Sequence, residues 1–138
     1  MTARREDLRV GEGAPARIFG PITVTDIVRY QGASGDMNPS HHDDGFARGA
    51  GFPGMFAPGL LGAGYLAAWA TEWLGADNVR RFGVRFRNQV WPGDHLTCSG
   101  AVTGVAEHDG LGVVELDLRC TRGDGDTVLE GWATFVVA

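Results

Sequence analysis

The chain has 138 residues, of which 43% are hydrophobic and 21% charged, and its formal net charge is −5 at pH 7. This length suits one soluble globular domain with its own core, which we place over residues 1–138. The acidic total argues against nucleic acid as a partner. The most apolar run, residues 60–70, is shorter than the about 20 residues that cross a bilayer, so no membrane segment is predicted.

The N-terminus and the cysteines indicate the compartment. Residues 1–7 are charged and have no apolar stretch of the kind that a signal peptide needs. The two cysteines, Cys98 and Cys120, lie in apolar runs typical of strands and lack the spacing of metal ligands. We therefore expect a cytoplasmic protein with reduced thiols and no metal site.

The N-terminal third predicts an arm, a short strand and a helix. Residues 1–16 are polar and contain Gly and Pro, which is typical of an extended arm. Residues 18–24 then predict a short, interrupted strand. Thr25-Asp26 is a candidate cap for a helix over 26–33. This helix is expected to turn three apolar side chains toward the core: Ile27, Val28 and Tyr30.

The turn after this helix gathers titratable side chains. Asp36 and His41 are five positions apart, and Asn38-Pro39 between them marks a turn. A carboxylate and an imidazole brought to one pocket form a suitable acid/base pair for neutral pH. The alternative is an ordinary turn whose histidines face solvent or cap a helix, since Asp and Asn are common turn residues.

A glycine-rich loop and a long apolar helix follow. The loop, residues 43–57, carries several apolar groups that either line a pocket or fold onto their own core: Phe46, Phe52, Met55 and Phe56. Pro58-Gly59 then opens a helix over 60–74 that is apolar almost all round, which predicts burial on most sides. Gly75 is placed to end it.

The rest of the chain predicts strands. Apolar residues alternate with arginines and a glycine over 81–87, a period of two. Residues 91–94 form a turn. Three further strands are expected over 95–106, 111–121 and 127–137. One long buried helix with about five mostly antiparallel strands is an α+β domain.

The turn carries a specific family resemblance. Residues 34–43 read Ser-Gly-Asp-x-Asn-Pro-x-His-x-Asp, which resembles the motif of the MaoC-like (R)-specific enoyl-CoA hydratases and dehydratases. The likeness extends from about residue 18 to the end and includes the Pro-Gly-Asp turn at 92–94. It implies the hotdog fold, in which an antiparallel sheet wraps one central helix. It also implies reversible hydration of a trans-2-enoyl-CoA to an (R)-3-hydroxyacyl-CoA, with no cofactor beyond the CoA of the substrate.

The resemblance also implies site residues. Asp36 and His41 would act on one water as the catalytic pair, and His42 would not. The N–H of Gly59, at the start of the long helix, would stabilise the thioester oxygen; the alternative is a glycine needed only for close packing. The substrate contacts would come from Asn38, Phe52, Met55 and Phe56. Pro58 and Ser40 stand where a histidine and an aliphatic residue are usual in the family, so the substrate preference can differ from that of the family. The run Phe-Pro-Gly-Met-Phe over 52–56 predicts a modified acyl pocket.

Two further expectations concern partners and competing activities. Arg81, Arg85 and Arg87 could contact the phosphates of CoA, or form a solvated strand face. An edge strand left open by this fold predicts a homodimer, and a heteromer is possible. A hotdog thioesterase would need a carboxylate on the buried helix, where Glu72 lies late. A non-catalytic subunit of a heteromeric hydratase would often lack the Asp36/His41 pair.

Overall fold

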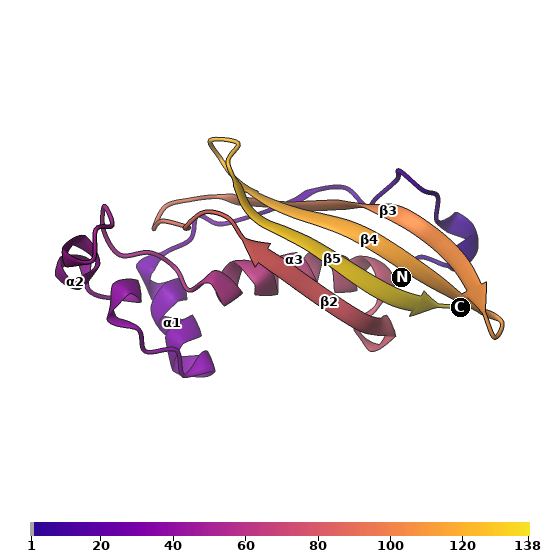
Figure 1. Ribbon diagram of the computed structural model, residues 1–138, viewed down its shortest axis with the longest axis horizontal. Coiled ribbons are helices and arrows are strands. Elements are labelled where there is room, and N and C mark those ends of the chain that lie inside the picture. The colour runs from indigo at the N-terminus through magenta and orange to yellow at the C-terminus, as the bar shows by residue number, and fades with distance from the viewer. Residues whose placement is uncertain (1) are drawn as a thin grey trace.

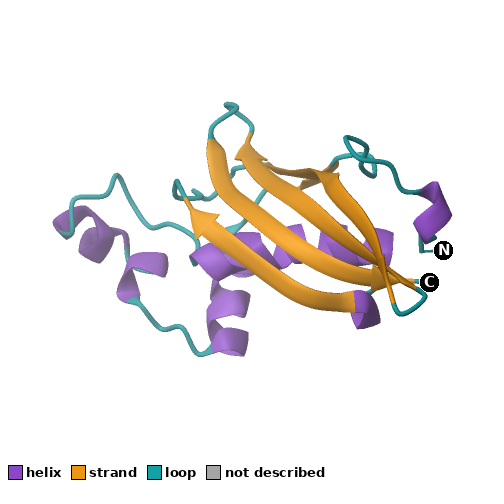
Figure 2. Ribbon diagram, turned by 45° about the vertical axis from the view of Figure 1, so that its right-hand side comes forward, coloured by secondary structure: helices purple, strands orange, loops and turns teal. Residues whose placement is uncertain are grey.

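A five-stranded antiparallel sheet curves around one long helix in the computed structural model, which describes residues 2–138 (Figure 1). The sheet order is β1-β3-β4-β5-β2. The strands are β1 (Arg17–Phe19), β2 (Val79–Phe86), β3 (Leu96–His108), β4 (Leu111–Arg122) and β5 (Thr127–Val137). The helix inside the curve is α3 (Gly59–Leu74), and two shorter helices, α1 (Val24–Ser34) and α2 (Asp44–Gly49), lie beyond one end of the sheet (Figure 2). The predicted α+β hotdog architecture is confirmed.

The core lies between the concave face of the sheet and α3. Along β4 the buried residues alternate with exposed ones, as the period of two predicts. The buried set on this strand is Val114, Leu116, Leu118 and Cys120. From α3 the core receives Leu61, Leu66, Trp69, Ala70 and Leu74. The two sets face each other, so the sheet and the helix cover each other's apolar surface.

Glycines on the strands allow the helix to approach closely. A Cβ added at Gly100 of β3 would lie 3.1 Å from Trp69, and one at Gly131 of β5 would lie 3.3 Å from Leu66. On the helix itself Gly59 and Gly62 face side chains of the sheet, whereas Gly64 faces open space. The helix ends at Gly75, which has φ of +91° and donates its N–H to Thr71 O.

The N-terminal helix differs from its prediction at its start. It begins at Val24, so residues 22–24 do not extend a strand, and β1 is three residues long. Thr23 is the cap rather than Thr25: its hydroxyl accepts the Asp26 N–H at 3.0 Å, and Asp26 Oδ2 accepts the Thr23 N–H at 2.8 Å. This earlier start turns Ile27 into the core but leaves Val28 half exposed, contrary to expectation.

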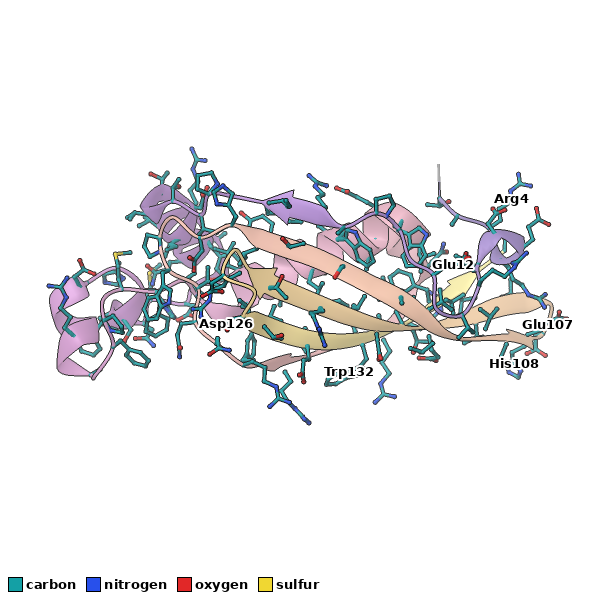
Figure 3. All side chains as sticks on the ribbon, turned by 90° about the horizontal axis from the view of Figure 1, so that it is seen from above. Arg4, Glu12, Glu107, His108, Asp126 and Trp132 are labelled. Atoms are coloured by element: carbon teal, nitrogen blue, oxygen red, sulfur yellow. The ribbon has the colours of Figure 1, made fainter. Side chains whose placement is uncertain are left out.

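The N-terminal arm runs along β3 rather than standing free. Gly11 N–H donates to Val102 O, and Val102 N–H donates to Glu12 O, both at 2.8 Å. Figure 3 shows Glu12 beside the sheet, with the arm following its edge. The buried Leu8 fixes the arm to the core. Among residues 2–138, no helix has both the length and the apolar character to cross a membrane.

Candidate active site

The turn that carries Asp36 follows directly from the end of α1. Gly35, in the left-handed region with φ of +76°, ends the helix and reverses the chain. Asp36 Oδ1 accepts the N–H of Asn38 at 3.3 Å, and Asn38 Oδ1 accepts the N–H of Ser40 at 3.0 Å. Asn38 thereby caps the short 3-10 helix Pro39–His41. The local turn chemistry and the gathering of titratable groups are therefore both present.

His41 is buried and held by the loop that leads into α3. Its exposed fraction is 6%, and its Nδ1 lies 2.7 Å from the carbonyl oxygen of Phe56. Its ring meets the Phe56 ring edge-on, with centroids 5.0 Å apart at 89°. A carbonyl oxygen can only accept, so Nδ1 carries the proton of this hydrogen bond. In the neutral imidazole this leaves the lone pair on Nε2.

The free nitrogen of His41 faces the carboxylate of Asp36. Nε2 and Oδ2 are 3.6 Å apart, which is too long for a direct hydrogen bond. The Asp36 side chain is 46% exposed, whereas that of His41 is 8% exposed. His41 is therefore fixed and buried, whereas Asp36 is open to solvent. A water molecule that bonds to both groups would fit this separation.

Aromatic rings beside His41 form the wall of the site. Phe52 packs on Phe56 with ring centroids 4.6 Å apart, and Trp91 approaches Phe56 edge-on at 5.9 Å. Met55 is anchored through its N–H to Asp44 Oδ1 at 2.8 Å and packs against the core. Phe46, by contrast, is 51% exposed and is not part of this wall. The glycine-rich loop thus places Phe56 against His41 and Phe52 against Phe56, whereas Met55 packs against the core.

A cavity of about 220 Å³ adjoins this wall at the start of α3. It is lined by Phe56, Ala57, Gly59, Phe86, Arg87, Asn88, Gln89, Val90 and Val128. Gly59 is the first helical residue, and the first N–H groups of a helix have no partner inside it. A Cβ at Gly59 would lie 2.6 Å from Cε1 of Phe86. The glycine therefore admits a close ring contact and lines a cavity that also includes Phe56, the residue whose carbonyl oxygen holds His41.

The predicted arginines differ in whether they reach the cavity beside Gly59. Arg85 lies on the outer face with Arg119 and Trp132, and Arg81 shares that face because it precedes Arg85 by four strand residues. Trp132 projects from this face on the side opposite α3 (Figure 3). Only Arg87 borders the cavity.

Arg87 is already engaged by an acidic partner. Its Nη2 lies 2.8 Å from Glu130 Oε2. The hydrogen bond from Arg87 lowers the pKa of Glu130 below its ordinary value, with the positive charge of Arg87 adding to the effect. Both side chains are more than two-fifths exposed, so a ligand phosphate would compete with a partly solvated ion pair.

Two neighbouring polar residues were not predicted to matter. Gln31 of α1 is 3% exposed and contacts the Asp36 turn, and His42 donates from Nδ1 to Gln31 Oε1 at 3.1 Å. His42 itself is exposed, in agreement with its predicted minor role. Gln31 lies four residues after the buried Ile27, so the helical period could have indicated that it faces inward.

A curved antiparallel sheet around one central helix, with a carboxylate and an imidazole beside the helix start, defines a hotdog domain of the hydratase type. The chain belongs to the family described as "MaoC like domain", whose model matches residues 9–123. The resemblance noted in the sequence is thereby confirmed.

Similar proteins carry hydratase and dehydratase names. The chain is 33% identical over 135 residues to an (R)-specific enoyl-CoA hydratase of Rhodospirillum rubrum, covering 96% of this chain and 90% of that protein. It is 28% identical over 113 residues to a mitochondrial 3-hydroxyacyl-(acyl-carrier-protein) dehydratase of Solanum lycopersicum, covering 81% and 68%. The structure of an (R)-hydratase from Pseudomonas aeruginosa superposes with a TM-score of 0.84 at 25% identity, covering 98% of this chain and 84% of that one.

Proposed function

We propose that this chain is a lyase that reversibly hydrates trans-2-enoyl-CoA to (R)-3-hydroxyacyl-CoA. The observation that carries the proposal is the orientation of His41: its Nδ1 is fixed to Phe56 O, and its Nε2 faces Asp36 Oδ2 at 3.6 Å. The named activity of the Rhodospirillum rubrum relative, which covers nearly the whole chain, supports CoA as the carrier of the acyl group. MaoC-like family membership supports the reaction class.

The pair has the chemistry that hydration requires. One water bonded to both Asp36 and His41 would be oriented toward C3 of the enoyl group. Asp36 takes a proton from the water as the water oxygen bonds to C3, and it passes this proton to the free Nε2 of His41. Nε2 then delivers the same proton to C2, which returns both groups to their starting state, so one water is added and no other proton is gained or lost. Because the two groups are coupled, the reverse division of these roles gives the same net reaction.

The start of α3 supplies the remaining requirement. Negative charge develops on the thioester oxygen as water adds, and backbone donors fixed in advance stabilise such charge. Gly59 N–H is the first donor of the helix, because Pro58 has none, and it borders the cavity beside Phe56. Phe52, Met55 and Phe56 would contact the acyl chain, and Asn38 holds the turn through Ser40 N–H.

Arg87 is the arginine best placed to approach CoA. It borders the cavity, whereas Arg81 and Arg85 lie on the outer face of the sheet. We therefore assign phosphate contact to Arg87 first.

The competing activities lack comparable support. A thioesterase carboxylate on α3 would have to be Glu72, but this side chain forms an ion pair with Arg17 late in the helix and is 59% exposed. A purely structural subunit would not need a histidine with one nitrogen anchored and the other facing a carboxylate.

The test is an assay of the hydration of crotonyl-CoA and longer enoyl-CoA thioesters, in which the rate is measured as the loss of the enoyl absorbance. Asp36→Asn and His41→Ala should each lower kcat/KM by about 10²-fold or more, the usual scale for general acid–base catalysis. That loss corresponds to about 2.7 kcal/mol in the barrier. His42→Ala is the matched control, since it removes the adjacent imidazole, and should change the rate much less. If folded Asp36→Asn and His41→Ala variants keep the parent rate, the assignment of this turn is wrong.

A further inference from the structure

The buried side-chain amide of Gln31 forms hydrogen bonds to the Asp36 turn. The buried polar residues among residues 2–138 are Gln31, Ser40 and His41, and all three lie at this turn. Gln31 comes from α1, four residues before the helix C-cap, and is 3% exposed. It does not border the cavity at Gly59. We propose that Gln31 is a positioning residue that sets the placement of Asp36 relative to His41; the catalytic part of this inference depends on the hydratase function above.

Both hydrogens of the Gln31 amide are used on the turn. Nε2 donates to the carbonyl oxygen of Asp36 at 2.8 Å and to that of Asn38 at 3.2 Å. Oε1 accepts the Nδ1–H of His42 at 3.1 Å. One side chain therefore fixes two carbonyls, two residues apart, on either side of Met37, and also contacts the residue after His41. The carbonyl oxygens can only accept, so a donor is required at this place.

Asp36 depends on this backbone support more than His41 does. The Asp36 carboxylate is 46% exposed, and its hydrogen bond is a local one to Asn38 N–H at 3.3 Å. His41 is held independently, through Phe56 O and by packing on the Phe56 ring. If the turn loosened, Asp36 would move while His41 stayed in place. A displacement of about 1 Å between reacting groups can cost about 10²-fold in rate.

Two replacements of Gln31 separate the effect of its hydrogen-bond donors from the effect of its side-chain length. Gln31→Met has a similar length but no donor, so it leaves the carbonyls of Asp36 and Asn38 without their buried partner. Gln31→Glu donates a single hydrogen when protonated and none when ionised. Burial and the two carbonyl oxygens disfavour the charged form of a carboxyl placed there, whereas the hydrogen bond from His42 Nδ1 favours it. Ionisation removes the single donor, so the activity of Gln31→Glu relative to the parent should fall as pH rises through the pKa of this carboxyl.

A second variant in the same helix controls for loss of packing. Ile27 is fully buried on the same face of α1, one turn before Gln31, and is not among the hydrogen-bonding residues of the turn. Ile27→Val should lower thermal stability while leaving kcat within about twofold of the parent, because it removes only a methyl group from the core. Gln31→Met should lower kcat by about 10- to 100-fold, with KM within about threefold, since the loss falls on orientation and not on substrate binding.

Amide hydrogen exchange measures the turn without any substrate. In Gln31→Met, exchange over residues 36–41 should speed up, while exchange in β3 and β4 stays at the parent rate. This result supports the positioning role even if the parent fails to hydrate enoyl-CoA, so the two proposals can fail separately. The role is overturned by unchanged exchange over 36–41, by parent-like kcat in Gln31→Met, or by a Gln31→Glu to parent activity ratio that does not depend on pH.

Discussion

The contact between Gly59 and Phe86 offers a way to separate packing from catalysis at the start of α3. A methyl group at Gly59 would lie 2.6 Å and 2.8 Å from two carbons of the Phe86 ring. Carbon atoms pack at about 3.5–4.0 Å, so the ring would have to move by about 1 Å. Phe86 is 53% exposed and can swing toward solvent, although it then loses its contact with the helix.

The expected stability change follows from two opposing terms. Overpacking costs about 1–3 kcal/mol, and replacing glycine by alanine in a helix returns at most about 1 kcal/mol. Gly59→Ala should therefore lower the unfolding free energy by about 1–2 kcal/mol, or Tm by about 3–8 °C for a chain of this size. In the Phe86→Ala background the same substitution should be neutral or stabilising, because the ring is gone. The parent, Gly59→Ala, Phe86→Ala and the double variant form a double-mutant cycle. Calorimetry on these four proteins gives the coupling energy between the two positions directly.

Turnover should not follow stability in this cycle. If the Gly59 N–H holds the thioester oxygen, a methyl group there obstructs the approach whether or not Phe86 is present. The double variant should then be as stable as Phe86→Ala but hydrate enoyl-CoA at least about 10-fold more slowly, approaching the 10²–10³-fold loss of an oxyanion donor. Gly59→Val should be slower still. A double variant that turns over as fast as Phe86→Ala would falsify the donor role and leave Gly59 as a packing residue alone.

Three other outcomes can be measured on the same protein. The hydrogen bonds from Thr23 lower the pKa of Asp26, so its stabilising effect is complete above the unfolded value, about 3.9, and is lost as pH falls through the lower folded value. The Tm difference between the parent and Asp26→Asn should thus be constant near neutrality and shrink below about pH 4; a difference that ignores pH would contradict this. The hydrogen bond to Cys120, with burial, raises the pKa of Cys98, and both thiols are fully buried. Ellman's reagent should therefore find no fast-reacting thiol in the native protein and two after unfolding, whereas rapid labelling of the folded chain would refute it. Sedimentation at micromolar concentration should give a homodimer, and a stable active monomer would count against pairing through β2.

Elements with a strong internal period were predictable from the sequence. The helix over 59–74 and the strands after it are long runs with a regular apolar pattern, and the structure places these elements as expected. Burial follows the period of two along β4, but not along β2, where Phe86 is exposed. The Asp36/His41 turn was predictable for a different reason. The hydrogen bonds of Asp36 to Asn38 and of Asn38 to Ser40 each span two positions, so the local motif indicates the turn itself. The bonds that hold it, from His41 to Phe56 and from Gln31 to Asn38, span 15 and 7 positions and lie outside the motif.

Features that depend on distant residues were not predictable. Phe86 reaches Gly59 across 27 positions, and no local pattern relates the two. The start of α1 was misplaced because Thr23 and Thr25 are equally good caps by type, and Asp26 decides between them by bonding back to Thr23. The period of two places Arg81, Arg85 and Arg87 alike, and only Arg87 reaches the cavity, because it lies just past the end of β2 beside Asn88 and Gln89.

The two borders of the sheet are unequal, and this has a consequence for assembly. Along β3, the short β1 pairs with residues 96–98, and the arm then bonds to Val102 on both its N–H and its carbonyl. At the other border β2 presents eight residues with no strand beyond it in the described chain. Because one edge of the sheet is covered and the other is open, another sheet can pair with this one only along β2. Two copies that meet antiparallel along β2 would use up both free borders, so growth would stop at a closed pair and not continue into a fibre.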